Sequence, residues 1–342
     1  MGLCLIGITV YSTLAISVDG LYDLLGNREM LEEKRTEIRV LRLKQQLQDS
    51  PIVSSYPFSS DREIRGAVKL WQDDQHRAQE QYGSVSHWNV SLIQDFSRLF
   101  QNAVNFTEDL SFWDVSSARN MSRMFQNALS FHSNLSSWDT GHVLDFSHIF
   151  HNALLFNGDV STWDVTGAFD LSFMFANAIA FQSNISLWTI PKQKEMGLQI
   201  RYAQNMESMF HNATSFHQDL SFWNTGTTTN MKSMFEGAIA FNSDLNDWNV
   251  GLVYNLDGMF RNARNFSGDL CWNILPSSSW EHMMEGSNGV VNVDCEQATV
   301  SHAASGTREH QHAKSDTNSS SFATLYLVGL SLAFSIGWSL GS

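Results

Sequence analysis

Large apolar residues recur along the middle of the chain at an interval of 25 residues. The interval holds for Trp and for two Phe positions, which lie 12 and 18 residues after each Trp. Ten further residues are inserted before the sixth unit. The recurring Trp residues are Trp88, Trp113, Trp138, Trp163, Trp188, Trp223 and Trp248. Seven units in step predict a repeat protein in which each unit packs on the next.

The unit at residues 110–128 shows what the pattern predicts locally. Leu110, Trp113 and Val115 are spaced as in a short strand, because Trp and Val alternate with a polar residue. Asn120 suits a helix N-cap, and the residues after it place apolar side chains at i, i+3, i+4 and i+7. Those side chains are Met121, Met124, Phe125 and Ala128. The equivalent cap positions are Asp95, Asp145, Asp170, Asn205, Asn230 and Asn255.

A strand and a short helix cannot bury their apolar faces alone, whereas stacked neighbours can. We therefore expect an α/β fold: a leucine-rich-repeat-like solenoid of about seven to eight strand–helix repeats of ~25 residues with an N-terminal helical cap. Trp takes the place of the middle Leu in the leucine-rich spacing. A degenerate eighth repeat is expected, with four apolar residues in the repeated roles. They are Leu270, Trp280, Met283 and Met284.

The repeated phrases "DLSFWDVS" at 109–116 and "NMSRMFQNA" at 120–128 resemble the BspA-like surface repeat family, which is also known from Mycoplasma lipoproteins of unknown function and is expanded in microalgae. The resemblance covers about residues 83–290, and residues 63–91 resemble the cap that precedes such arrays. It implies a leucine-rich-repeat-like fold and a cell-surface setting, with adhesion for some bacterial members. It supplies no catalytic residues. Gly237, which replaces a repeated Asn, departs from the pattern.

The chain divides around the array. The N-terminal 1–17 are apolar and end in the small-residue pattern of a signal peptidase site, so they form a signal peptide or an uncleaved signal anchor. The C-terminal 322–342 follow a small polar spacer and form a glycosylphosphatidylinositol (GPI) anchor signal or a membrane helix. The remaining segments are 18–57, a charged helix or linker; 58–87, the cap; 88–297, the repeats, with an insertion at 189–200; and 298–321, a disordered stalk.

These signals predict a protein that enters the secretory pathway and stays on the extracellular side of the plasma membrane. In that oxidising setting Cys271 and Cys295 would form a disulfide, although two free buried thiols are the alternative. Eight Asn-x-Ser/Thr sequons occur, and we expect only exposed ones to carry glycans. The candidates are Asn89, Asn105, Asn134, Asn184 and Asn318.

The net charge of the chain and the absence of known catalytic motifs exclude some classes of function. The formal charge of −14 without a basic patch argues against nucleic-acid binding. No phosphate loop, nucleophile elbow or zinc pattern is present, so we expect no enzyme activity and no cofactor. His148 and His151 lie three residues apart on an expected helix and would suit a metal. Because Arg123 and Gln126 replace them one repeat earlier, we interpret this as a variable solvent face and assign no metal site.

The outward residues of the expected strands form the best candidate binding surface, since solenoids usually bind partners there. They are Ser111, Phe112, Asp114, Ser137, Asp139, Thr162, Asp164, Phe222 and Asn224. The two Phe are either exposed for contact with a sugar or peptide, or partly buried at strand edges. The stacked Asp residues either form a solvated polar row or recruit Ca²⁺.

We therefore predict a protein- or glycan-binding adhesion module. A structural cell-wall or surface-coat component is the alternative, and a Ca²⁺-dependent binding array is more distant.

Overall fold

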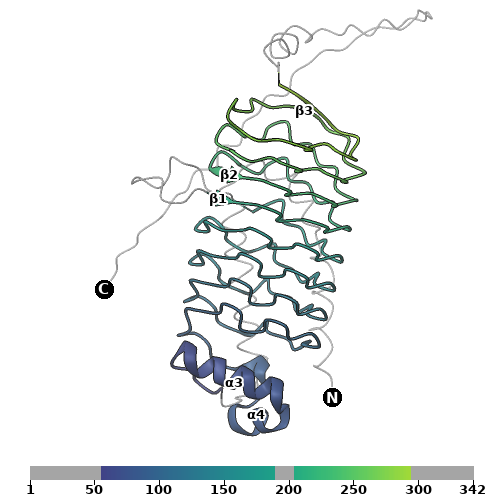
Figure 1. The fold of residues 1–342 in the computed structure, drawn as a ribbon. Helices are drawn as coiled ribbons and strands as arrows, with labels where there is room; N and C mark the ends of the chain where they lie inside the picture. The colour runs from purple at the N-terminus through teal and green to yellow at the C-terminus, as the bar shows by residue number, and fades with distance from the viewer. Residues whose placement is uncertain (1–54, 189–203, 294–342) are drawn as a thin grey trace, which may run out of the picture. The chain divides into compact units, whose positions relative to one another are not determined.

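The computed structural model describes residues 55–188 and 204–293. Element labels follow Figure 1. The chain begins with two helices and a short 3₁₀ helix, and continues in successive coils of similar outline (Figure 1). Strand β1 pairs in parallel with β2, and β3 pairs in parallel with β4. The elements are α3 (Asp61–Asp73), α4 (Gln75–Tyr82), η1 (Val85–His87), β1 (Gln204–Asn205), β2 (Thr228–Asn230), β3 (Asp269–Cys271) and β4 (Val290–Asn292).

We call each repeat a rung and number the rungs by their Trp, so that Trp88 lies in the first and Trp248 in the seventh. Neighbouring rungs pair in parallel through single bridges at one equivalent position. The fifth and sixth rungs pair at the same position through β1 and β2, with a local shift of register between Gln204 and Asn205. The bridges join Asp95 to Asn120, Asn120 to Asp145, Asp145 to Asp170, Asp170 to Asn205, Asn230 to Asn255 and Asn255 to Ser279.

The helix expected after Asn120 does not form. Arg123 and Asn127 have φ angles of 58° and 61°, in the left-handed region, and an α-helix cannot pass through such residues. The segment is instead a chain of tight turns, in which the N–H groups of Met124 and Ala128 donate to the carbonyl groups three residues before them. The strand–helix prediction is therefore wrong for this part of the rung. The equivalent segments of the other described rungs also form turns rather than helices.

The turns alternate with hydrogen bonds to the next rung. The N–H groups of Met121, Arg123, Phe125 and Asn127 donate to carbonyl groups of the third rung at 2.8–2.9 Å. In a helix that starts at Asn120, the N–H groups of Phe125 and Asn127 would instead bond to carbonyl groups four residues before them. The predicted capping role of Asn120 is confirmed only in part. Asn120 Oδ1 accepts a hydrogen bond from the N–H of Ser122, but the segment that follows is a turn and not a helix.

The expected strand at 110–115 is also a turn. The N–H of Trp113 donates to the carbonyl of Leu110 at 3.1 Å. Leu110, Trp113 and Val115 are nevertheless all buried, as the apolar pattern predicts. The sequence pattern therefore identifies the inward residues while misassigning the backbone that presents them.

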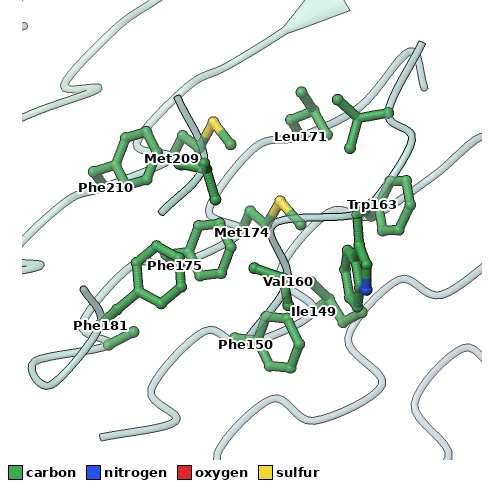
Figure 2. Packing of buried hydrophobic residues seen from close by; sticks show 14 of the residues in the cluster. Ile149, Phe150, Val160, Trp163, Leu171, Met174, Phe175, Phe181, Met209 and Phe210 are labelled. Atoms are coloured by element: carbon green, nitrogen blue, oxygen red, sulfur yellow. The ribbon is translucent and has the colours of Figure 1, made fainter. Parts of the chain in front are cut away.

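Columns of aromatic rings fill the core, one ring from each rung. Trp138 and Trp163 stack with ring centroids 6.0 Å apart, and the Phe at the position of Phe150 stacks on its neighbours at 5.5–5.7 Å. Figure 2 shows Phe150, Phe175 and Trp163 in this arrangement. Within one rung the two Phe rings lie 3.7–4.2 Å apart. Burial of such large rings, about 150–250 Å² each, is the main stabilising contribution of a rung.

The Trp indoles also join the rungs through their polar atom. The indole N–H of Trp138 donates to the carbonyl of Leu110 in the preceding rung at 2.9 Å. The same bond recurs for the Trp of the second to seventh rungs and for Trp272, at 2.8–3.1 Å. This bond satisfies a buried indole donor, and it explains why Trp replaces Leu at this position.

The degenerate eighth repeat differs from the prediction at its Trp. Trp272, and not Trp280, stacks on Trp248, with ring centroids 6.5 Å apart. Trp280 is 45% exposed. Leu270 and Met283 are buried, as expected for their roles, and Met284 is partly buried against the core. The eighth rung has one residue fewer between its Leu and its Trp, so the 25-residue interval points to Asn273 and misses Trp272 by one position.

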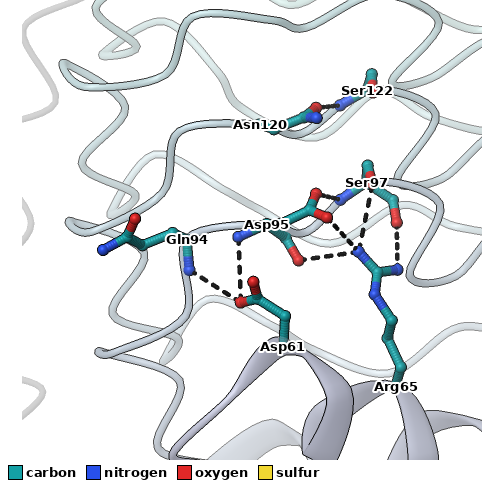
Figure 3. Close-up of polar contacts among 7 residues, drawn as sticks. All are labelled: Asp61, Arg65, Gln94, Asp95, Ser97, Asn120 and Ser122. Carbon is teal, nitrogen blue, oxygen red and sulfur yellow. Dashed lines mark hydrogen bonds and ion pairs between the residues drawn. The ribbon is translucent and has the colours of Figure 1, made fainter.

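Helix α3 covers the open edge of the first rung through two charged residues (Figure 3). Asp61 Oδ1 accepts hydrogen bonds from the N–H groups of Gln94 and Asp95, both at 3.3 Å. Arg65 donates through Nη1 to the carbonyl of Ser97 at 2.5 Å and through Nη2 to the carbonyl of Asp95 at 3.1 Å. Ile64, on the same helix, is buried in the core.

The Asp61 and Arg65 side chains make the hydrogen bonds that the backbone of a preceding rung would make. Between the first and second rungs, the N–H groups of Arg119 and Asn120 donate to the carbonyl of Gln94. The Asp61 carboxylate takes the place of such a carbonyl. Each rung also donates hydrogen bonds to the rung after it: the N–H groups of Phe96 and Arg98, in the first rung, donate to carbonyl groups of the second rung. Within the described residues no rung precedes the first one, and the Arg65 guanidinium donates to its carbonyl groups instead.

The substitution Arg65→Ala should therefore destabilise the protein, because it leaves two backbone carbonyls at the rung edge without donors. We expect the free energy of unfolding in urea to fall by about 1–3 kcal/mol. Arg62→Ala is the matched control, since Arg62 lies exposed on the same helix; its effect should stay within about 0.5 kcal/mol. Equal losses in the two variants would contradict the capping role.

Candidate ligand-binding face

The predicted binding residues lie on the turns that surround each buried Trp, and we call this surface the Trp-turn face. It is built from the residues at the positions of Ser111 to Ser116 in each rung. Phe112 is 43% exposed and Phe222 is 70% exposed. Asp114 and Asp164 are exposed, whereas the other predicted residues are half-buried. The half-buried ones are Ser111, Ser137, Asp139, Thr162 and Asn224.

The Asp column of this face holds turns together. Asp114 Oδ1 accepts a hydrogen bond from the N–H of Ser116 at 3.1 Å, and Asp164 Oδ1 accepts from both the N–H and the hydroxyl of Thr166. Asp139 and Asn224 make the same contact to the N–H two residues on, each at 3.3 Å. Such Asx turns are a common use of Asp and Asn. One oxygen of each side chain is therefore engaged locally.

The hydroxyl groups of this face also serve the fold. The Ser137 hydroxyl donates to the carbonyl of Ser111, and the Thr162 hydroxyl donates to the carbonyl of Ser136 at 2.6 Å. Each bond joins one rung to the rung before it. Ser137 and Thr162 are thus half-buried and bonded within the stack, and their contact with a ligand stays a prediction.

The two Phe residues do not form one cluster. Phe112 belongs to the second rung and Phe222 to the sixth, so three rungs lie between them. Phe112 also stacks on His87, with ring centroids 5.3 Å apart and an interplanar angle of 16°. Phe222 is the more exposed ring and has the larger free surface.

A second polar surface includes His151, which the sequence pattern assigns to a variable solvent face without predicting the contacts between rungs. The position of Gln126 forms a column that runs along the rungs, and we call it the ladder face. Its members are Gln101, Gln126, His151, Ala176, His211, Glu236 and Arg261. Gln101 donates to Gln126, which contacts His151, and Glu236 is paired with Arg261. His211 Nδ1 lies 3.8 Å from Glu236 Oε2, is buried, and makes no hydrogen bond within the described residues.

Burial lowers the pKa of the ladder-face histidines and of His148, which lies beside them. Burial, followed by the nearby His151 and Arg123, lowers the pKa of His148 to about 4, and Asp145 opposes this. Burial also lowers the pKa of His151 and of His211. Burial raises the pKa of Glu236, but hydrogen bonds and nearby positive charge outweigh it, so the net pKa is lowered. These imidazoles are therefore neutral at pH 7.

Other predicted sites are distributed over the described residues. No group of three or more His, Cys, Asp or Glu suited to a metal ion occurs in residues 55–188 and 204–293. Asn89, Asn105 and Asn134 are exposed, Asn184 is half-buried, and Asn318 lies outside the described residues. Cys271 is disulfide-bonded. Its pairing with Cys295 stays a prediction, because Cys295 also lies outside that part of the chain.

The segments that the sequence predicts to direct the protein to the membrane lie outside the described residues. They are the predicted signal segment 1–17 and the terminal segment 322–342. The same holds for most of the charged segment 18–57, the insertion 189–200 and the predicted stalk 298–321. Within the part that is described, no helix is both long and apolar enough to cross a bilayer.

Comparison with known families finds two matches along the chain. The family model described as "Mycoplasma protein of unknown function, DUF285" matches residues 73–188 and residues 191–296. Together the matched stretches cover more than half of the chain and include every recurring Trp. No curated protein and no solved structure gives a match.

The low pKa of His148 predicts a pH dependence of stability. The folded protein keeps His148 neutral down to about pH 4, whereas an unfolded chain protonates it near its ordinary pKa of 6.5. Its contribution to stability is therefore complete above pH 6.5 and is lost as the pH falls from 6.5 towards 4. His148→Arg, which introduces the residue found one rung earlier, should flatten the stability–pH curve in this window.

Urea unfolding at several pH values would measure this effect. His132→Asn is the control, because His132 is exposed and Asn157 occupies its equivalent position one rung on. The control curve should run parallel to that of the wild type. A His148→Arg curve with the wild-type slope between pH 6.5 and 4 would contradict the prediction.

Proposed function

The chain belongs to the DUF285 family of Mycoplasma-type repeat proteins, and we propose that its rungs form a BspA-like, leucine-rich-repeat-like solenoid that binds a protein or glycan at the cell surface. The observation that supports this best is the Phe222 ring, which is 70% exposed on the Trp-turn face. A large exposed aromatic ring among polar groups offers a stacking surface to a sugar or a peptide side chain.

The turn that carries Phe222 is held firmly in place, which favours ligand binding by this side chain. Phe222 lies in a turn closed by the bond from the Trp223 N–H to the Leu220 carbonyl at 3.0 Å. Trp223 itself is buried between Trp188 and Trp248, with ring centroids 6.3 Å away on both sides. An anchored turn keeps an exposed ring in place, so little conformational entropy is lost when a ligand covers it. We accordingly propose a binding protein without catalytic activity.

A structural surface-coat component is the second candidate. It is favoured by the engagement of Ser137, Thr162 and the Asp column in the turns and in bonds between rungs. A face whose polar groups already hold the stack together offers few groups to a ligand. The same engagement weighs against the Ca²⁺-dependent array, because one oxygen of each carboxylate is already taken.

Ligand binding can be tested with the repeat-bearing ectodomain on glycan and protein arrays. Phe222→Ser and Phe112→Ser introduce the residue that the third rung carries at this position. Each should raise the Kd of a bound ligand about tenfold or more, the loss of roughly 1.4 kcal/mol expected for one aromatic contact.

The matched control is Ile239→Thr. Ile239 is 41% exposed away from the Trp-turn face, and Thr214 occupies its equivalent position one rung earlier. This variant should bind as the wild type does. Absence of saturable binding to any ligand, or equal binding by all variants, would favour the coat component.

We also propose that the protein reaches the extracellular side of the plasma membrane and is held there by its C-terminal segment. The support is the sequence pattern of both ends. Phosphatidylinositol-specific phospholipase should release the protein from intact cells if the anchor is a glycosylphosphatidylinositol lipid. Full retention after this treatment would instead support a membrane-spanning C-terminal helix.

A further inference from the structure

Two imidazole rings of the third rung face each other on the ladder face. His148 Nδ1 lies 3.0 Å from His151 Nδ1, and Gln126 Nε2 lies 3.2 Å from the same atom of His151. Both histidines are half-buried. The turn geometry creates this arrangement, because His148 has a φ of 57° and the N–H of His151 donates to the carbonyl of His148.

The distance between the two nitrogens fits a shared metal ion. Zn²⁺ binds imidazole nitrogen at about 2.0–2.1 Å, so two ligands at tetrahedral angles lie roughly 3.3 Å apart. The two Nδ1 atoms need to separate by only a few tenths of an ångström to reach one ion. Without a metal, one ring must donate Nδ1–H to the other; with a metal, both lone pairs point at the cation.

The rings are held in place by the next rung. Phe173 stacks on His148 with ring centroids 4.6 Å apart and an interplanar angle of 3°, and it lies 5.8 Å from the His151 ring. Packing that fixes ligand orientation reduces the entropy lost on metal binding. Neutral imidazole is the form that binds metals.

Charged groups near the two histidines have opposing effects on positive charge at the imidazole rings. Asp145 favours positive charge at His148, whereas Arg123 opposes it at both rings. His211 opposes positive charge at His151 as well. Gln126 offers an amide oxygen to the pair if its terminal amide turns over, and the Gln101 amide must then turn over with it to accept from the Gln126 NH2 group.

We propose that His148 and His151 form a binding site for a borderline divalent transition-metal ion such as Zn²⁺, with the Gln126 amide oxygen as a third ligand and water completing the coordination. Imidazole nitrogen suits Zn²⁺, Ni²⁺ and Cu²⁺, and it does not suit Ca²⁺ or Mg²⁺. This site is independent of the Trp-turn face and of its proposed ligand. It also reverses the sequence-based interpretation of this pair as a variable solvent face.

Neighbouring rungs supply variants that the fold already accommodates. The second rung carries Arg123 and Gln126 at the positions of His148 and His151. The double variant His148→Arg/His151→Gln therefore removes both ligands and restores a pair that the same turn tolerates. His132→Asn/His217→Asn is the matched control: it removes two exposed histidines, and Asn157 and Asn242 stand at the equivalent positions of the following rungs.

Zn²⁺ titration calorimetry and thermal unfolding of the full chain test the proposal. ZnCl₂ in large excess over its Kd should raise the unfolding midpoint of the wild type and of the control by about 3 °C or more, because the ion binds the folded state. The double variant should show no such shift, and its calorimetric titration should lack one site or bind about tenfold more weakly.

Equal Zn²⁺ binding and equal shifts in all three proteins would overturn the proposal, because the other histidines of the chain would then account for the metal. CaCl₂ and MgCl₂ should shift none of the proteins. If the double variant fails to fold, His151→Gln alone gives the same test, since it removes one of two imidazoles and leaves His148 packed on Phe173.

Discussion

The hydrogen bonds that each rung donates to the next constrain everything else in this protein. In the segment that begins at Met121, every second N–H donates to the next rung. The backbone between these groups must turn tightly. The turns place residues four positions apart, Arg123 and Asn127, in the left-handed backbone conformation. Asn127 occupies one such position, and its amide donates to Asn102 in the preceding rung at 2.7 Å. Asn tolerates this conformation better than other non-glycine residues and here adds a bond between rungs.

The sequence predicted which residues are buried better than it predicted the backbone. Met121, Met124, Phe125 and Ala128 are all buried, because two consecutive four-residue turns point nearly the same side chains inward as a helix does. Periodicity alone cannot separate the two. The repeated Asn before Ala was the available signal, since left-handed Asn ends helices and forms turns. Trp272 was missed because the spacing shortens by one residue in the last rung.

The candidate sites were predictable to different degrees. The exposure of Phe112 and Phe222 followed from their place between buried residues, although partial burial at an edge remained open. The His148–His151 pair was visible as a spacing, but on a helix it would have lain on a solvent face. Only the left-handed turn and the Phe173 ring bring the two nitrogens together. Polar residues that interrupt the apolar pattern therefore have separate roles: most close turns, and a few stay available for binding.

We infer that each rung of 25 residues is a modular unit held in register by its neighbours. Deletion of residues 135–159 tests this directly, because Val160 then takes the place of Leu135 and the backbone hydrogen bonds between rungs can re-form. The shortened protein should unfold cooperatively in urea and keep the protected amide protons of the remaining rungs in hydrogen exchange. Deletion of residues 135–147 should abolish this protection. Loss of cooperative unfolding in the 25-residue deletion, or equal behaviour of both deletions, would contradict the account.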